Sequence, residues 1–517
     1  MFAKRYSPDE LIDIIAAPSY SPEIINYVKK VASEPFLSQF LSQKPKLGIT
    51  GTIAKDYVEG DTKDAVPYVS TKQVKGLHAY IDDAKYISKE ADIEWAKCRV
   101  EDGDIIINKS GNVGAAAVLC CAPYAYANSV SDIINIKLAK NSEIDRDYLV
   151  VYLNSPYGQK QLQRLSGGAI FSHVSLHAIP DIRIFHPDIK AQKYIGDKVR
   201  QAEQLRAWAK QLEAMIEQRF GFLVEDLPSP KKYFSVKPED LSPYRINPKQ
   251  YDPVVTGTLS RAEKSGISLE RLEGLIDARG IAGGATPKGA NYKSSGVLFC
   301  RVQNVKKLAL DLSDAVYIGK DDDETLKRSR CKSNDIVLTI TGYPGTASLV
   351  IDEDLPVNLN QHSVRFGCKE TIKPGYLCAV VNSSFVKLQV DRASIGGTRD
   401  ALDYPSVTNL LIPRLDTTSE EAIHDAAINF VKAIKASKQL TESAKALVEA
   451  LIEGLLTEQQ LIQAQQALDD GDNSLDQAIL SKLSNEGYAI EGATPLFSDL
   501  DELNRLLESA AQAGAEE

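Results

Sequence analysis

The side chains of this chain that could do chemistry lie in short polar segments beside glycine-rich turns. Residues 103–119 read "GDIIINKSGNVGAAAVL", which predicts a strand, a turn and a return strand. The turn supplies Asn108, Lys109, Ser110 and Asn112. Small polar side chains on such a hairpin can approach phosphates or base edges closely, so the turn is a candidate for nucleic-acid contact. An ordinary hairpin turn is the alternative interpretation.

A second segment repeats this pattern with different residues. Residues 334–350 read "NDIVLTITGYPGTASLV", and their turn supplies Thr339, Thr341, Tyr343 and Thr346. A position that only supports the fold should keep its residue between two copies, whereas a position that reads a ligand can diverge. The changed residues therefore favour recognition at both turns.

Two further pairs of polar segments carry groups suited to base edges. Arg and Lys can pair with guanine, and Gln and Asn with adenine, while lysines can equally hold phosphates. A solvated strand end is the alternative. The candidates in "STKQVKG" and "CRVQNVKK" are Lys72, Gln73, Lys75, Arg301, Gln303, Asn304, Lys306 and Lys307. Those in "NSVSD" and "NLNQH" are Asn128, Ser129, Ser131, Asn358, Asn360, Gln361 and His362, and those around two double-glycine loops are Ser172, His173, Arg399 and Asp400.

These segments belong to one long internal repeat. A block near residues 8–220 returns near residues 238–452, displaced by roughly 230 positions, which is too long for a solenoid repeat. For example, "DYLVVYLNS" at residues 147–155 returns as "GYLCAVVNS" at residues 375–383. The repeat predicts a duplicated domain.

Each copy is predicted to contain short strands, a helix, a final strand and one long helix. The shorter helices are expected near residues 146–163 and 374–390, and the final strands at residues 179–185 and 409–413. The long helices are expected at residues 189–220 and 419–456, about 32 residues or more, which is roughly 48 Å. Apolar residues at spacings of three and four predict a seam between them: Leu205, Trp208, Leu212 and Met215 in the first helix, and Leu440, Ala444, Leu447 and Leu451 in the second. Packing of each helix on its own domain alone is the alternative.

The net charge of −10 is unevenly distributed. Residues 458–517 hold thirteen acidic and two basic residues, a net charge of −11, so residues 1–457 carry a net charge of +1. The duplicated body can therefore still carry a basic face. Seven cysteines without CxxC spacing predict reduced thiols in a cytoplasmic protein, and Cys98 and Cys331, at equivalent positions, are expected to be buried. The sequence shows no apolar run long enough for a membrane span and no opening typical of a signal peptide.

Motifs typical of enzymes are missing from the sequence. We find no P-loop, no [DN]PP[YF] methyltransferase tetrapeptide, no HExxH and no GxSxG. His173 and His177 have helical spacing but no third metal ligand nearby. The acidic pairs Asp102/Asp104 and Asp352/Asp354 lack the lysine that a nuclease places close by. The sequence therefore favours a binding protein with no catalytic or metal-binding residues.

In this order of motifs, the chain resembles the specificity subunits of type I restriction-modification systems. The resemblance rests on the "GDIIINKSGNVG" segment, the "Y-L-x-x-x-x-N-S" helix start, the double-glycine loop, the "PDIKAQKYI" helix and the "ISLERLEGLIDARGIAGGATP" opening of the second copy, over roughly residues 8–455. The first long helix departs from the family's frequent Pro-Pro-x-x-Glu-Gln opening, and the acidic tail is not a usual feature.

The resemblance implies an α+β chain of two similar α/β target-recognition domains separated by two long antiparallel helices, with pseudo-two-fold symmetry. The expected boundaries are residues 1–187 for the first domain, 188–222 for its helix, 223–253 for a linker, 254–415 for the second domain, 416–456 for its helix and 457–517 for the acidic tail.

The implied function is non-catalytic reading of a bipartite site on double-stranded DNA. The helix pair would set the distance between the half-sites and dock two adenine methylase subunits, and motor-nuclease subunits would join for cleavage. S-adenosylmethionine and ATP would be bound by these partners only, and no membrane is involved. Three alternatives remain open from the sequence: a DNA-recognition subunit of a phage-defence methylation system that is not type I, an enzyme with an unrecognised motif, and a scaffold that binds no DNA.

Overall fold

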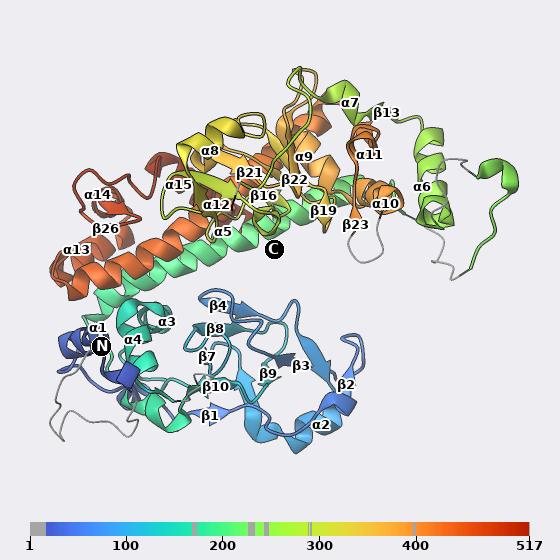
Figure 1. Cartoon of the computed structure of the whole chain (residues 1–517). Coiled ribbons are helices and arrows are strands. Elements are labelled where there is room, and N and C mark those ends of the chain that lie inside the picture. Colours follow the sequence, from blue (N-terminus) through green and yellow to red (C-terminus); the bar gives the residue numbers. More distant parts are fainter. Residues whose placement is uncertain are drawn as a thin grey trace. The chain divides into compact units, whose positions relative to one another are not determined.

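The computed structural model describes residues 17–167, 173–225, 233–241, 248–287, 289, 292–395 and 400–515. The chain forms two compact units (Figure 1). Unit 1 comprises Met1–Gln204 and Ala436–Glu508, and unit 2 comprises Leu205–Lys435 and Ser509–Glu517. Across the described ranges, none of the helices has the length and apolar character needed to cross a membrane.

Unit 1 contains two five-stranded sheets, with strand orders β1-β10-β7-β8-β4 and β2-β5-β3-β9-β6. Ile106 and Leu119 of the first sheet share a buried cluster with Val100 and Ala127 of the second. The first sheet consists of β1 (Lys46–Leu47), β4 (His78–Tyr80), β7 (Ile105–Asn108), β8 (Ala116–Cys120) and β10 (Ile133–Ile136). The second consists of β2 (Tyr57–Val58), β3 (Val66–Val69), β5 (Lys85–Ile87), β6 (Arg99–Glu101) and β9 (Tyr126–Ser129).

The strand β7 is apolar along its length because both of its faces are covered. Its residues Ile105, Ile106 and Ile107 are all 0% exposed. The second sheet covers one face, and the helix α3 (Arg146–Asn154) packs on β8 of the same sheet. A strand buried on both sides carries no polar alternation, which is why this one reads as a continuous apolar run. The predicted hairpin over residues 103–119 is confirmed by the antiparallel pairing of β7 with β8.

Unit 2 has a five-stranded sheet of order β14-β22-β18-β20-β16 and a three-stranded sheet of order β17-β15-β21. The larger sheet consists of β14 (Ala282–Gly283), β16 (Leu308–Ala309), β18 (Ile336–Thr339), β20 (Ala347–Leu349) and β22 (Ser363–Phe366). The smaller one consists of β15 (Val297–Cys300), β17 (Val316–Ile318) and β21 (Val357–Leu359). β18 and β20 pair antiparallel, so the hairpin predicted at residues 334–350 is confirmed.

The two units share a strand order. The larger sheet of unit 2 repeats the order of the first sheet of unit 1. In this order β14 corresponds to β1, β22 to β10, β18 to β7, β20 to β8 and β16 to β4. Parallel pairing occurs at the same places, between β3 and β9 and between β4 and β8 in unit 1, and between β15 and β21 and between β16 and β20 in unit 2. The sequence repeat is therefore matched by a repeat of topology.

Each helix that was predicted near residues 146–163 and 374–390 is in fact a pair of helices. α3 ends at Asn154, and α4 (Pro156–Arg164) begins after Ser155, whose hydroxyl accepts from the Gly158 N–H. In unit 2, α9 (Pro374–Asn382) and α10 (Ser384–Ala393) are divided at Ser383 in the same way. A serine in extended backbone caps the following helix more favourably than it continues the preceding one, and this local competition outweighs the apolar periodicity.

The final strand predicted at residues 179–185 is also corrected. Residues Leu176–Asp181 form a 3-10 helix, and only Arg183 makes a bridge, to Phe36. Pro180 lacks the N–H that a strand would donate, which limits pairing there. In unit 2 the corresponding prediction is confirmed, since β24 (Leu411–Arg414) pairs with β13 (Ser268–Arg271).

A buried acid holds the smaller elements of each unit together. In unit 1, Asp92 is 2% exposed and accepts hydrogen bonds from Arg99 Nε at 2.9 Å and from Asn128 Nδ2 at 2.8 Å. In unit 2, Asp323 accepts from Asn358 Nδ2 at 2.8 Å and pairs with Arg330 at 2.5 Å. A buried carboxylate is tolerated only when charged and polar partners replace its water, and both copies supply the same partners.

Two long helices extend through both units. α5 (Ile189–Gly221) places residues 189–204 in unit 1 and the rest in unit 2, whereas α12 (Thr417–Ile452) places residues 436–452 in unit 1 and its first part in unit 2. The predicted seam residues Leu205, Trp208, Leu440, Ala444, Leu447 and Leu451 are buried, whereas Leu212 and Met215 are only half-buried.

The acidic tail is folded over the residues described. It forms α13 (Glu458–Asp469), α14 (Ser474–Leu480), the short hairpin β25 (Leu483–Ser484) and β26 (Gly487–Tyr488), and α15 (Leu500–Ala515). Asp476 is buried and accepts from the Tyr194 hydroxyl at 2.6 Å and from Lys198 Nζ at 2.5 Å. The tail residues of unit 1 therefore dock on the first part of α5 through charges that are removed from water.

We expect Asp92→Ala to lower the free energy of unfolding of unit 1 by about 2 kcal/mol, because Arg99 and Asn128 would lose a buried acceptor. Urea-induced unfolding measures this loss. Asp61→Ala, at an exposed turn position, is the control and should change the midpoint little. An Asp92→Ala protein as stable as the control would show that the buried cluster does not hold unit 1 together.

Candidate nucleic-acid interface

The predicted polar segments of unit 1 meet at one edge of its two sheets. We call this the unit 1 loop edge and define it as residues 70–75, 109–114 and 130–132. Asn108 Nδ2 donates to the Thr71 carbonyl at 3.5 Å, the Val130 N–H donates to the Val69 carbonyl at 3.0 Å, and Ser110 Oγ donates to Asp132 Oδ1 at 2.7 Å. Three segments far apart in the sequence thus form one continuous surface.

The unit 2 loop edge comprises residues 301–307, 340–346 and 360–362. The Asn360 N–H donates to the Cys300 carbonyl at 3.1 Å, and the Ile340 N–H donates to the His362 carbonyl at 2.9 Å. Thr286 also reaches this edge, because its hydroxyl donates to Gln361 Oε1 at 2.5 Å. The structure therefore brings the corresponding predicted segments together in unit 2 as well.

The hairpin turns of the two loop edges share a backbone frame. The Gly114 N–H donates to the Asn108 carbonyl at 2.8 Å, and the Gly345 N–H donates to the Thr339 carbonyl at 2.9 Å. The Lys109 N–H donates to the Asp132 carbonyl at 2.8 Å, which matches the bond from Ile340 in unit 2. Both turns are consequently rigid and expose the same sequence position at their tips.

Several predicted contact residues are buried and hold the loops instead of facing outward. Gln73 is 7% exposed and accepts from the Ser70 N–H at 2.9 Å. Asn304, its counterpart, is 0% exposed and accepts from the Arg301 N–H at 2.9 Å. The remaining predicted residues with buried side chains are Asn108, Asn128, Ser129, Thr339, Asn358 and Asn360. These buried side chains therefore support the loop edges from within.

Other predicted residues are partly exposed but engaged within their own unit. Arg301 NH2 donates to the Asp314 carbonyl at 2.7 Å, and Gln303 Nε2 donates to Asp314 Oδ2 at 2.6 Å. Lys307 Nζ pairs with Glu213 of α5 at 3.0 Å. These contacts use the groups that would otherwise face a ligand.

A third set of predicted residues is accessible at the loop edges. Tyr343 is 84% exposed. Lys72, Lys75, Asn112, Lys306 and Gln361 are also exposed, and Lys109, Ser110, Ser131, Thr341, Thr346 and His362 are half-buried. Lys75 pairs with Asp83 at 3.2 Å, with both side chains largely in solvent. His173 is exposed next to the unit 1 turn, where the Val174 N–H donates to the Lys109 carbonyl at 3.3 Å, and Asp400 is half-buried beside Thr341. Ser172 and Arg399 lie outside the described residues.

Two residues at these edges were not singled out from the sequence. Asp132 binds Ser110, and Thr286 binds Gln361. The repeat register offered a signal for Asp132, because it occupies the position of His362 in the second copy. Thr286 had no such signal, since only the folded chain brings its segment to the edge.

A buried ionic network links the sheet of unit 1 to α5. His78 Nε2 lies 2.7 Å from Asp147 Oδ1, and Asp147 Oδ2 accepts from Arg200 NH1 at 2.7 Å. Burial lowers the pKa of His78, but its hydrogen bonds to Asp147 and Cys120 outweigh burial and raise the pKa to about 9. Burial raises the pKa of Asp147, but His78 and Arg200 leave that pKa below its ordinary value. β4 and α3 are thus attached to the first part of α5 through charges.

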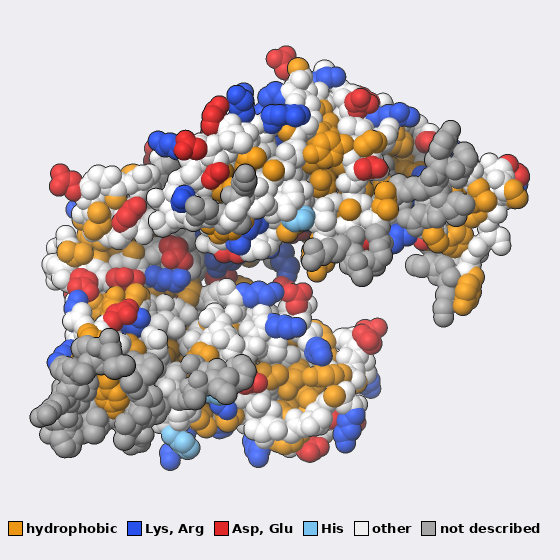
Figure 2. Space-filling view, in the orientation of Figure 1, with side chains coloured by type: hydrophobic (Ala, Val, Ile, Leu, Met, Phe, Trp, Pro, Cys, Tyr) orange, Lys and Arg blue, Asp and Glu red, His pale blue; other side chains and the backbone are white. Residues whose placement is uncertain are grey.

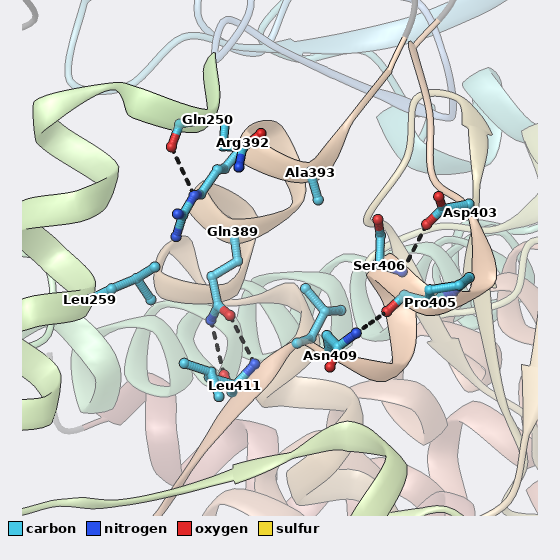
Figure 3. Close-up of a pocket in the computed structure, with 11 residues that line it drawn as sticks. Gln250, Leu259, Gln389, Arg392, Ala393, Asp403, Pro405, Ser406, Asn409 and Leu411 are labelled. Carbon is cyan, nitrogen blue, oxygen red and sulfur yellow. Dashed lines mark hydrogen bonds between the residues drawn. The ribbon is translucent and has the colours of Figure 1, made fainter. Parts of the chain in front are cut away.

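Several of the polar groups that line a cavity of about 420 Å³ in unit 2 have hydrogen-bond partners (Figure 3). Gln389 Nε2 donates to the Leu411 carbonyl at 2.9 Å, and its Oε1 accepts from the Leu411 N–H at 2.8 Å. Asn409 Nδ2 donates to the Pro405 carbonyl at 2.8 Å. The hydrogen bonds of Gln389 therefore join α10 to β24 at this cavity.

The surface carries charges of both signs. On the face that Figure 2 shows, Lys and Arg side chains are interspersed with Asp and Glu side chains.

In the part of the chain that the structure describes, no group of three or more His, Cys, Asp or Glu side chains could hold a metal ion. Cys98 and Cys331 are buried, as their equivalent positions predicted, and burial raises the pKa of both thiols.

Comparison with known proteins identifies the class. Residues 50–218 match the family model described as the type I restriction modification DNA specificity domain. The EcoBI specificity subunit of the type I restriction enzyme from Escherichia coli is 22% identical over 322 residues, or 60% of this chain. The chain spans 63% of the length of that relative. The match over residues 50–218 and this relative confirm the resemblance to type I specificity subunits that the sequence predicted.

Solved structures of such subunits also match most of the chain. The S subunit of a type I restriction-modification system from M. genitalium is 10% identical with a TM-score of 0.42, and the match covers 82% of this chain and 96% of that one. The HsdS subunit from Thermoanaerobacter tengcongensis is 14% identical with a TM-score of 0.25, over 85% of this chain and 96% of that one.

The raised pKa of His78 predicts a pH-dependent stability. Protonated His78 stabilises the folded state fully below its unfolded pKa of 6.5, and this contribution is lost as the pH rises through about 9. We expect the free energy of unfolding to fall by about 2 kcal/mol over this window. Urea unfolding between pH 6 and pH 9.5 measures the decline. His78→Gln should abolish it and His177→Gln, at an exposed position, should retain it, whereas an identical decline in all three proteins would contradict the assignment.

Proposed function

We propose that this chain is the non-catalytic DNA-reading subunit of a type I restriction-modification system. The observation that carries the proposal is the pair of loop edges, which have the same strand order and the same backbone frame but different exposed side chains. A reader of a bipartite site needs this combination, because a common scaffold can present different recognition groups to two different half-sites. The specificity-domain match over residues 50–218 supports the assignment for unit 1.

The proposal assigns DNA contact to the accessible residues of each loop edge. In unit 1, the exposed Lys72 and the half-buried Lys109 are candidates for phosphate contact, next to Ser110 and Asn112. In unit 2, Lys306, Gln361 and Tyr343 occupy the corresponding edge. Phosphate contacts orient a protein on the duplex, whereas contacts to base edges discriminate between sequences. The buried Gln73, Asn108, Ser129, Asn304 and Asn360 shape these surfaces and make no direct contact in this proposal.

The two long helices serve as the spacer between the half-sites. Each compact unit contains a part of both α5 and α12, and the predicted apolar seam is mostly buried, which supports pairing of the helices as a coiled coil. At 33 residues, α5 is about 50 Å long, so the half-sites would be separated by at most about 15 base pairs. Two modest binding surfaces on one stiff frame reach a higher combined affinity than either alone.

The chemistry is assigned to partner subunits. Two adenine methylase subunits would dock on the helical part of the chain and bind S-adenosylmethionine, and motor-nuclease subunits would bind ATP. A map of methylated adenines in the host genome tests the whole proposal. We expect a split motif with a gap of fixed length that disappears when the gene for this chain is deleted. A methylation pattern unchanged by the deletion would refute it.

Replacement of the two lysines should affect only one half-site. We expect Lys72→Ala with Lys109→Ala to weaken binding of the full site and to reduce the slope of log K against log salt by about 2, since each lost phosphate contact removes roughly 0.9. The measurement is a DNA-binding titration at several salt concentrations, with oligonucleotides in which either half-site is scrambled.

Lys140→Ala is the matched control, because Lys140 is exposed beyond the opposite end of β10. The double variant should still distinguish correct from scrambled sequence in the half-site that unit 2 reads. Equal loss of discrimination at both half-sites would contradict the division between the units. Absence of DNA binding by the unmodified chain at every salt concentration would instead favour a scaffold without a DNA ligand.

A further inference from the structure

The two hairpin turns differ most at the tip that their common frame exposes. Asn112 and Tyr343 occupy the same position, one residue after a glycine with positive φ, at +72° for Gly111 and +87° for Gly342. A residue with a side chain would have a strained backbone at either glycine position. The exposed side chain at the tip is therefore that of the following residue. Unit 1 thus presents a carboxamide where unit 2 presents a phenol ring.

Tyr343 is the most exposed of the large hydrophobic side chains in the described part of the chain, at 84%. Its backbone is nevertheless held tightly. Its carbonyl accepts from Thr339 Oγ1 at 2.7 Å, and the next carbonyl, of Pro344, accepts from Lys387 Nζ at 3.0 Å. Gly345 lies directly against Val390 of α10, where a Cβ would approach within 2.8 Å. The ring therefore lies in solvent, while these contacts hold the backbone that carries it.

Such an arrangement suits an aromatic ring that meets another flat, apolar surface. A tyrosine held in water loses little conformational entropy on binding, because its backbone is already ordered and it has only two side-chain torsions. Nucleobases offer such surfaces when they are partly unstacked, and an aromatic ring can stack on any base. Asn112 lacks a ring but carries the amide donor and acceptor that pair with adenine.

We infer that the tip position of each loop edge contacts a base: Tyr343 contacts a base of the second half-site through its ring, and Asn112 reads a base of the first through its amide. This inference rests on the proposed function and adds the mode of contact. Stacking tolerates any base, so Tyr343 should contribute affinity, whereas the amide of Asn112 should contribute discrimination between bases. Neither contact involves a charge, so the salt dependence of binding should be unchanged.

The test compares Tyr343→Ala, Tyr343→Phe and Asn112→Ala in the full-length chain. We expect Tyr343→Ala to weaken binding of the intact site roughly tenfold with an unchanged salt slope. Tyr343→Phe should retain most of the affinity, because the ring remains. Asn112→Ala should relax selectivity in the other half-site only. Tyr233→Ala is the matched control, since Tyr233 is 82% exposed but lies outside the unit 2 loop edge, in the segment that the sequence predicted as a linker.

A fluorescent base analogue reports the ring contact directly. With 2-aminopurine at each position of the second half-site in turn, the unmodified chain should change the fluorescence at one position, and Tyr343→Ala should abolish that change. If Tyr343→Ala binds DNA and changes the fluorescence like the unmodified chain, the inference is overturned and the proposed function stands. Loss in Tyr343→Phe as large as in Tyr343→Ala would overturn stacking in favour of a hydroxyl contact. If the unmodified chain binds no DNA, the proposed function itself fails.

Discussion

The loop edges depend on one constraint: a chain that reverses direction at the edge of a sheet must still satisfy its backbone hydrogen bonds. Both units meet it with the same bonds, from Gly114 to Asn108 and from Gly345 to Thr339. Glycine is required at these places because the backbone has positive φ and passes close to a helix. These bonds do not involve the side chain of the tip residue, so that side chain can differ between the units.

The distinction between supporting and reading positions follows from the same constraint. Asn128 and Asn358 are identical in the two copies because each must satisfy a buried acid, Asp92 or Asp323. Gln73 and Asn304 differ only in length and accept the same backbone hydrogen bond. A difference between the two copies nevertheless does not by itself identify a position that contacts a ligand. Asn108 and Thr339 differ, yet both are buried at the base of the turn, where either side chain can fit.

Charge plays a different part in this molecule from the one its total suggests. The acidic tail accounts for the negative net charge of the sequence. Its Asp476 forms a buried ion pair with Lys198 and is not exposed at the surface. The network of His78, Asp147 and Arg200 likewise uses charge to attach a sheet to a helix. Buried pairs of this kind give little net stability but penalise every arrangement in which one partner is left alone, so they favour one geometry.

The sequence by itself determined the duplication, the hairpins, the long helices and the family resemblance, because these depend on local periodicity and on a repeat that can be read without coordinates. It also located the segments that form both loop edges. Only the tertiary structure decided which side chains in those segments are accessible. These side chains are engaged by neighbours that the local pattern does not indicate: Asp83 and Asp314 lie 10 and 11 residues from their partners, and Thr286 lies 75 residues from Gln361. The division of the predicted helices at Ser155 and Ser383 is instead a local effect, in which a capping hydrogen bond outweighed apolar spacing.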